Sequence, residues 1–303
     1  MEIIPWKAGD PPIPTGSTAI FAMKAEDYHS DPCEKPSLSS SIAKRMVGES
    51  PYHGWLMHPK LGGCGMSSAA MDRGTLIHSM ILGHVEDEFV LIEADDYRTK
   101  AARSARDSAR AEGKTPVKVA DYRDAEATAA EVHEDLLHRG ISLTGHSEIV
   151  LVWVENVDGV DVQCRAMLDH IIPENSTIID FKNCESAHPS AVQRSIYNYG
   201  YDVQYAAYTS AYDKVFPDLA GRSEFLWAFI EQLPDEAPRK SAVQLYRPDG
   251  MMRELGRKRW ARGLKLWAGC IATGHWPFYG VEPISIAPAG WVVKEELSEH
   301  DAG

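Results

Sequence analysis

Two aspartates and a lysine lie close together in one β-rich stretch of this 303-residue sequence. Asp169 precedes Asp180 by eleven residues, and Lys182 follows Asp180 by two. Carboxylates are hard oxygen ligands that suit Mg²⁺ or Mn²⁺, and a neighbouring lysine could orient or help to deprotonate a metal-bound water. Brought together, residues of these types could hydrolyse a phosphodiester bond.

Turn signals around these residues predict a three-stranded meander and set its register. Counting outward from a two-residue loop at 158–159 places Glu148 opposite Asp169. Counting from a four-residue loop at 173–176 places Asp169 opposite Asp180. The sequence therefore predicts three carboxylates in one row across three adjacent strands.

A row of three acids is unstable without a cation. Side chains directly opposite each other have Cβ atoms about 4.5–5.5 Å apart, so three carboxylates repel unless a positive charge lies among them. Lys182 lies on the face of Asp180, since strand side chains alternate with a period of two. The alternative is a solvated polar face with ordinary charges, which the apolar flanks Ile171, Ile172, Ile178 and Ile179 disfavour.

The surrounding elements must position these groups. Apolar periodicity predicts helices over 67–82, 202–216 and 253–273, and a strand over 224–232. We also expect a short helix that Pro51 ends or interrupts, and two charged surface helices in 100–139 separated near residues 113–116. Helices before a meander, then helix, strand and helix, predict an α/β (α+β) core.

Composition limits the classes of function. A chain of 303 residues that is 44% hydrophobic can bury a full core, and we expect an irregular segment 1–30, one domain 31–285 and a tail 286–303. The net charge of −13 excludes a protein that coats nucleic acid over its whole surface, so any DNA contact must use a local basic lining. The five cysteines form no CxxC pair. Without a long apolar run or leader, a soluble, cytoplasmic protein with no membrane contact is expected.

The spacing of Asp169 from Asp180-Phe181-Lys182 resembles the signature of the PD-(D/E)XK nucleases, although Leu168 stands where that signature has proline. That resemblance implies a restriction-endonuclease-like core, with a central mixed β-sheet flanked by helices.

Two further motifs make the resemblance more specific. Gln204 and Tyr208, one helical turn apart, resemble the QxxxY motif of the RecB-type branch of these nucleases. Gly74 and His78 resemble the GxxxH helix that supplies a histidine metal ligand in the same branch. The ordered set, from Ser37 to about Gly280, is similar to the RecE-type (exodeoxyribonuclease VIII) exonucleases of phages and prophages.

The resemblance implies an activity and partners. It implies Mg²⁺-dependent digestion of linear double-stranded DNA in the 5′→3′ direction, which releases mononucleotides and leaves a 3′ single strand for recombination. It also implies a ring-shaped homo-oligomer around DNA and a single-strand annealing protein as partner.

It also implies roles for individual residues. The metal ligands would be His78, Asp169, Asp180 and, through its carbonyl, Phe181. Lys182 would be the catalytic lysine, and Glu148 the strand glutamate near the metals. Gln204 and Tyr208 would hold the scissile strand or the lysine.

Several residues could contact DNA, each with a structural alternative. Arg165 could clamp a phosphate or be only a salt-bridge partner. A stripe at helical spacing could guide DNA to the site or be a solvated face: Lys100, Arg103, Arg106 and Arg110. Three residues near the first helix could contact a terminal phosphate: Ser39, Ser41 and Arg45.

Two other readings remain open. The same core could serve an endonuclease, either a restriction enzyme or a junction resolvase. A degenerate site would leave a DNA-binding recombination scaffold, which the intact Asp169, Asp180 and Lys182 argue against.

Overall fold

A seven-stranded mixed sheet forms the centre of the computed structural model, which describes residues 2–64, 69–83, 89–234, 236–280, 282–288 and 290. The strand order is β1-β2-β5-β6-β7-β8-β9. The strands are β1 (Ile4–Pro5), β2 (Ala19–Ala22), β5 (His146–Val157), β6 (Val160–Ile172), β7 (Thr177–Cys184), β8 (Glu224–Gln232) and β9 (Ser241–Tyr246). Only the β1–β2 and β7–β8 pairs of this sheet are parallel, so the predicted mixed sheet is confirmed.

The meander β5-β6-β7 has the predicted register. Val157 pairs with Val160 across a loop whose residues 158 and 159 both have positive φ, +50° and +87°, as a tight hairpin turn requires. Ile172 pairs with Thr177, and the four residues between them form a short 3₁₀ turn that ends in the left-handed conformation. The two turn signals in the sequence therefore fix the alignment of all three strands.

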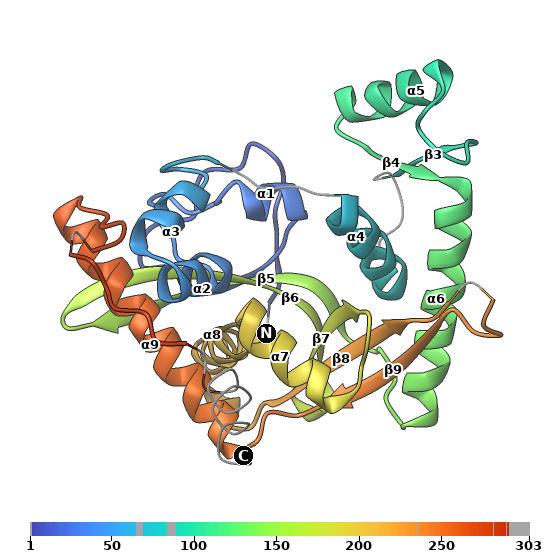
Figure 1. The fold of residues 1–303 in the computed structure, drawn as a ribbon. Helices are drawn as coiled ribbons and strands as arrows, with labels where there is room; N and C mark the ends of the chain where they lie inside the picture. The colour runs from blue at the N-terminus through green and yellow to red at the C-terminus, as the bar shows by residue number, and fades with distance from the viewer. Residues whose placement is uncertain are drawn as a thin grey trace, which may run out of the picture.

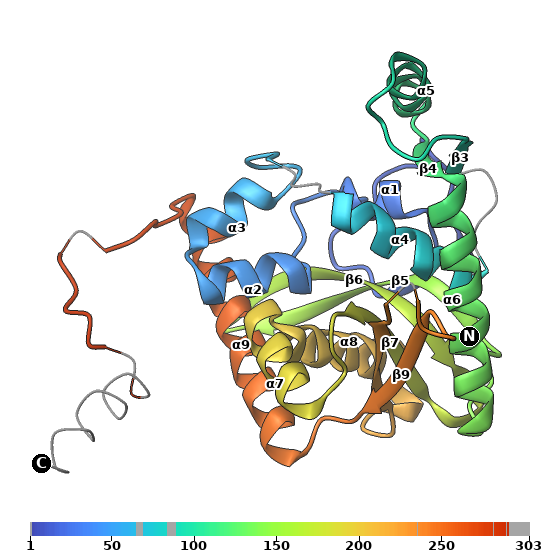
Figure 2. The same ribbon diagram turned by 45° about the vertical axis from the view of Figure 1, so that its right-hand side comes forward.

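Helices cover both faces of the sheet (Figures 1 and 2). One face packs against α2 (Ser40–Gly48), α8 (Tyr201–Val215) and α9 (Gly250–Thr273), where Trp153, Trp227 and Trp267 are buried together. The other face packs against α4 (Ala69–Leu82) and α6 (Val119–His138). Because β7 and β8 are parallel, the chain must cross over between them, and α7 (Pro189–Tyr199) and α8 make that crossover.

Several elements differ from the sequence expectations. The first 30 residues are not wholly irregular, since β2 pairs with β5 and α1 covers Ala25–His29. Pro51 occupies the first turn of a new helix, α3 (Pro51–Met57). The strands β3 (Phe89–Ile92), β4 (Thr115–Lys118) and β9, which are four to six residues long, and the helix α7 were not predicted.

The charged region 100–139 is also more than a pair of surface helices. Its first helix, α5 (Lys100–Ala111), extends away from the body beyond β3 and β4 (Figures 1 and 2). Its second, α6, buries Val132 and Leu136 in the core. No helix among the described residues is long and apolar enough to span a membrane. Most of the predicted tail, and the first two residues of the helix expected at 67–82, lie outside the described residues.

A buried polar network attaches the N-terminal segment to β6. Arg165 is 3% exposed and donates to the Ser37 carbonyl at 2.6 Å and the Ser37 hydroxyl at 2.7 Å. Its Nη1 also lies 3.4 Å from the Asp31 carboxylate. Burial alone would raise the pKa of Asp31, but the His58 hydrogen bond and the Arg165 charge lower it to about 2. The ionised Asp31 therefore stabilises the fold.

We expect Asp31→Asn to destabilise the protein by about 3–5 kcal/mol at neutral pH, since it leaves the Arg165 charge buried without its counter-ion. A depressed folded pKa gives stability that is present above the unfolded value of about 3.9 and lost as pH falls toward about 2. The difference between wild type and variant should therefore shrink below about pH 4. Denaturant unfolding at several pH values measures it, with the exposed Asp96→Asn as control; equal stability of both variants at pH 7 would contradict the network.

Candidate active site

The strands β6 and β7 separate at the two aspartates. Their pairing runs from Ile172↔Thr177 to His170↔Ile179. One step further, Asp169 Oδ2 accepts the backbone N–H of Phe181 at 2.8 Å. A side-chain oxygen thus satisfies an N–H that a regular ladder would bond to a carbonyl. This opening in the sheet is where the predicted chemical groups meet.

Glu148 lies in the predicted register with Asp169 but in a distorted part of β5. The pairs Ser147↔His170 and Ile149↔Leu168 flank it, and its φ of +49° is in the left-handed region that a glutamate rarely adopts. The regular pleat that would place three carboxylates in one row is interrupted here. Among the described residues, no three His, Cys, Asp or Glu side chains converge as a metal-binding group. The positive φ of Glu148 breaks the alternation from which the single row was predicted, so the row stays a prediction.

Asp180 is the most enclosed acid of the site. Its side chain is fully buried, and the Lys182 ammonium lies 2.6 Å from Oδ2, a buried oxygen that no well-aligned hydrogen bond satisfies. Gln204 on α8 donates to the other oxygen, Oδ1, at 3.0 Å. The same Gln204 amide also donates to the Tyr208 hydroxyl at 2.8 Å. Gln204 and Tyr208 thus face the site together, and Gln204 holds Asp180 while Tyr208 accepts from the same amide.

His78 approaches from the opposite face, on α4. Its Nδ1 lies 3.8 Å from Asp169 Oδ2, and its ring meets the Phe181 ring edge-on at 6.2 Å between centroids. Burial, followed by the nearby Lys182 charge, lowers the pKa of His78 to about 4. The imidazole is therefore neutral near pH 7, the form in which histidine binds metals.

The two acids resist ionisation in the folded protein. Burial raises the pKa of Asp180 to about 6, against the lowering effect of Lys182, and the charge of Asp169 adds to the rise. Burial likewise raises the pKa of Asp169. Burial would lower the pKa of Lys182, but Asp180 and Asp169 raise it above its usual value. The pair of acids thus shares one close ammonium. Two neighbouring carboxylates beside a neutral histidine are donors of the kind that can hold a divalent cation.

Two residues at the site were missed by the sequence analysis. Lys44 on α2 and Tyr201 at the start of α8 lie beside Lys182, whose ammonium is 4.8 Å from the centre of the Tyr201 ring. The Lys44 ammonium is 5.9 Å from the same ring. Burial, followed by the charge of Lys182, lowers the pKa of Lys44 to about 8. No local pattern marks Lys44, because only the packing of α2 brings it to the site.

Some predicted DNA contacts have structural roles instead. Arg165 is buried against Asp31 and Ser37, so the salt-bridge alternative describes it and the phosphate clamp does not. Ser39 is buried and caps α2 by accepting from the Ile42 N–H at 3.4 Å.

The other predicted DNA contacts differ in their exposure and in their ion pairs within the protein. Arg45 is paired with Glu49, one helical turn away, and Ser41 is half-buried. On α5, Arg103 and Arg110 are exposed. Arg106 pairs with Asp107 at 2.8 Å.

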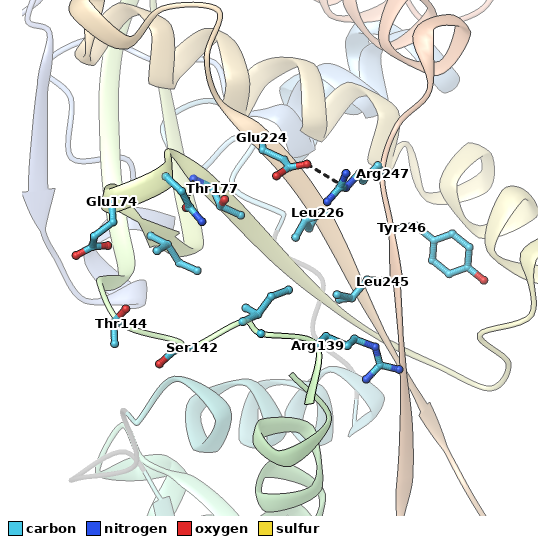
Figure 3. Close-up of a pocket in the computed structure, with 14 residues that line it drawn as sticks. Arg139, Ser142, Thr144, Glu174, Thr177, Glu224, Leu226, Leu245, Tyr246 and Arg247 are labelled. Carbon is cyan, nitrogen blue, oxygen red and sulfur yellow. Dashed lines mark hydrogen bonds and ion pairs between the residues drawn. The ribbon is translucent and has the colours of Figure 1, made fainter. Parts of the chain in front are cut away.

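A separate pocket lies at the other end of the parallel strands. Its volume is about 730 Å³, and it is lined by Thr177 and Glu224, which begin β7 and β8, and by residues after α6 such as Arg139. Figure 3 shows Glu224 paired with Arg247, and their side chains are 3.0 Å apart. None of His78, Asp169, Asp180 and Lys182 lines this pocket.

Comparisons with known proteins agree with this architecture. The sequence model of a family described as a PDDEXK-like domain of unknown function (DUF3799) matches residues 47–280. A solved structure of a candidate exonuclease from Eubacterium rectale is similar with a TM-score of 0.56 and 14% identity, covering 93% of this chain and 98% of that chain. A phage-related exonuclease from Haemophilus somnus 129PT has a TM-score of 0.31 and 14% identity, covering 66% of this chain and 95% of its own. A sequence search of curated proteins finds no match.

We expect Asp169→Asn to stabilise the protein in metal-free buffer, because it leaves the Asp180 carboxylate in balance with the Lys182 ammonium. The raised pKa of both acids means that the fold opposes their ionisation, so the gain should be present at pH 8 and vanish below about pH 3, where both acids are protonated even when unfolded. A gain of about 1 kcal/mol raises Tm by about 2–4 °C in a chain of roughly this size. Thermal unfolding in chelator measures it against the exposed Asp218→Asn; a lowered Tm would show that the ionised Asp169 stabilises the fold.

Proposed function

The chain belongs to the family of PDDEXK-like domains (DUF3799) and carries a nuclease fold, and we propose that it is a Mg²⁺-dependent exonuclease of linear double-stranded DNA. The observation that carries the proposal is the buried Asp180, bracketed by Lys182 at 2.6 Å and Gln204 at 3.0 Å, in the opening between β6 and β7. An ion pair with only a structural role would need no separation of the two strands beside it.

The oxygens and nitrogen of this opening would hold the metal. Asp169, Asp180, the Phe181 carbonyl and the neutral His78 are the proposed ligands, and Mn²⁺ could replace Mg²⁺. The ion supplies Lewis-acid stabilisation of the phosphate and a more acidic water. Glu148, in register with Asp169, completes the site in this proposal.

The protein's own groups have distinct tasks. Gln204 fixes one oxygen of Asp180 by a hydrogen bond, which leaves the other oxygen directed to Lys182. The Lys182 ammonium would orient the attacking water and stabilise the negative charge that develops on the phosphate. Lys44 adds a second positive charge beside it, in a site that is otherwise acidic.

The finer parts of the proposal concern the substrate and the direction of cleavage. The similarity to RecE-type exonucleases, with Gln204, Tyr208 and His78 at the site, supports attack on duplex ends in the 5′→3′ direction, release of mononucleotides and a 3′ strand for recombination. Endonuclease and scaffold are the competing readings. End-labelled linear DNA and closed circular DNA, each with and without Mg²⁺, separate them: we expect loss of linear DNA only, with Mg²⁺ only. Cleavage of circles would favour an endonuclease, and no cleavage a scaffold.

We expect Lys182→Ala to reduce hydrolysis by about a hundredfold to a thousandfold, the scale on which a group that stabilises transition-state charge acts, while metal binding persists. The rate of nucleotide release measures the first, and calorimetric titration with Mn²⁺ the second. Lys258→Ala, which removes an exposed lysine 2.8 Å from Glu254, is the matched control. Full activity of Lys182→Ala would remove the lysine from the mechanism.

The basic stripe on α5, in which Arg103 and Arg110 are exposed, is proposed to guide DNA. We expect the triple Arg103→Ala, Arg106→Ala, Arg110→Ala variant to weaken binding and to lower the slope of log affinity against log salt by about one for each phosphate that the variant no longer neutralises. Binding of blunt duplex in Ca²⁺, to suppress cleavage, measures the slope. A triple variant of α9 that removes the same charge, at Arg257, Lys258 and Lys265, is the control. Equal slopes in both variants would make the stripe a solvated face.

Two partners stay predictions that rest on the resemblance. These are a ring-shaped homo-oligomer that encloses DNA and a single-strand annealing protein. The net charge of −13 is compatible with a ring, because a local basic lining would confine DNA to its channel. The mass of the native particle distinguishes a ring from a monomer.

A further inference from the structure

The junction between α7 and α8 places two tyrosine rings side by side, and the inner one, Tyr201, lies next to Lys182. Gly200 ends α7 and begins α8 with a φ of +65°, a conformation that favours glycine. A Cβ at this position would lie 2.9 Å from the Cβ of Lys44, so α2 also approaches closely here. The turn brings the rings of Tyr199 and Tyr201 to 5.7 Å between centroids, with 33° between their planes.

The inner ring is held in place on several sides. Tyr201 packs against the buried Phe229 with 6.2 Å between ring centroids. The ammonium groups of Lys182 and Lys44 lie 4.8 and 5.9 Å from its centre. Tyr201 is therefore held in one position between Lys182 and the second ring, Tyr199.

The outer ring, by contrast, is open to solvent. Tyr199 is 60% exposed, although its partner Tyr201 is half-buried. Tyr197 on the same helix is also exposed, at 65%, but the Arg259 guanidinium lies 5.3 Å from its ring and is held there by Asp202 at 2.7 Å. Tyr199 is thus an exposed aromatic ring against Tyr201, whose other neighbours are the ammonium groups of Lys182 and Lys44. An exposed ring with basic groups nearby is the combination that binds single-stranded nucleic acid by stacking.

We propose that Tyr199, supported by Tyr201 and Lys44, stacks on an unpaired base next to the scissile phosphate, and that this contact selects DNA ends. Within a duplex each base is covered on both faces by its neighbours. A side chain that stacks on a base can therefore reach only a terminal or displaced one. This inference rests on the proposed nuclease function and deepens it: the site takes a frayed end, and Tyr199 is a positioning residue rather than a catalytic one.

Binding to DNA with and without bases isolates the stacking contact. The probe is a short duplex whose terminal nucleotides on both strands are unpaired, compared with the same duplex carrying abasic sugars there, which keeps every phosphate. Binding is measured in Ca²⁺ for wild type, Tyr199→Ala, Tyr199→Phe and the control Tyr197→Ala. We expect Tyr199→Ala to weaken binding of the base-containing probe at least about fivefold, the effect of removing one stacked base, and to leave the abasic probe unaffected. Tyr199→Phe and Tyr197→Ala should bind both probes like wild type.

Two other results would overturn the inference. Equal weakening of both probes by Tyr199→Ala would mean a general structural effect, and unchanged binding of both would mean that the ring does not meet a base. In either case the wild-type protein still binds DNA, so the proposed nuclease function stands. Failure of the wild-type protein to bind both probes would instead overturn the proposed function and, with it, the inference. A kinetic readout in Mg²⁺ adds to the test: removal of the stacking ring should raise KM for frayed ends and leave kcat nearly unchanged.

Discussion

The buried charge of Asp180 is the constraint on which the rest of the site depends. A carboxylate removed from water is stable only with an opposite charge or hydrogen-bond donors close by. Lys182 and Gln204 supply these from β7 and α8, so the strand and the crossover helix must stay in one relative position. The Phe181 N–H donates a hydrogen bond to the Asp169 carboxylate and so holds it beside Asp180. The site is therefore built into the core of the fold, not added on a surface loop.

Much of the fold followed from local signals in the chain. The Asp158-Gly159 turn and the loop before Thr177 fix the register of the meander, and turn chemistry is readable from a few residues. Strand β8 also has the predicted bounds, since apolar residues run through it without a break. The elements that were missed are short or depend on partners far away in sequence, such as β2, which forms against β5.

The candidate site was predictable to the extent that strand register determined it. Asp169, Asp180 and Lys182 were placed by counting from turns, but counting assumes a regular pleat, and the positive φ of Glu148 breaks it. Arg165 shows a second limit: its pairing with Asp31 depends on where the N-terminal segment folds, which no local pattern gives. Lys44 was missed for the same reason, because only tertiary packing brings it to Lys182.

The attachment of the N-terminal segment to β6 changes what counts as the folding unit. The family match begins at residue 47, yet Arg165, inside the match, has its counter-ion at Asp31. A fragment that began at residue 47 would keep a buried guanidinium and lose its carboxylate. The fragment would also lack β2, so β5 would become an edge strand with Val150 and Val152 exposed. Open apolar edges pair with other chains, so such a fragment would aggregate even though it contains His78, Asp169, Asp180 and Lys182.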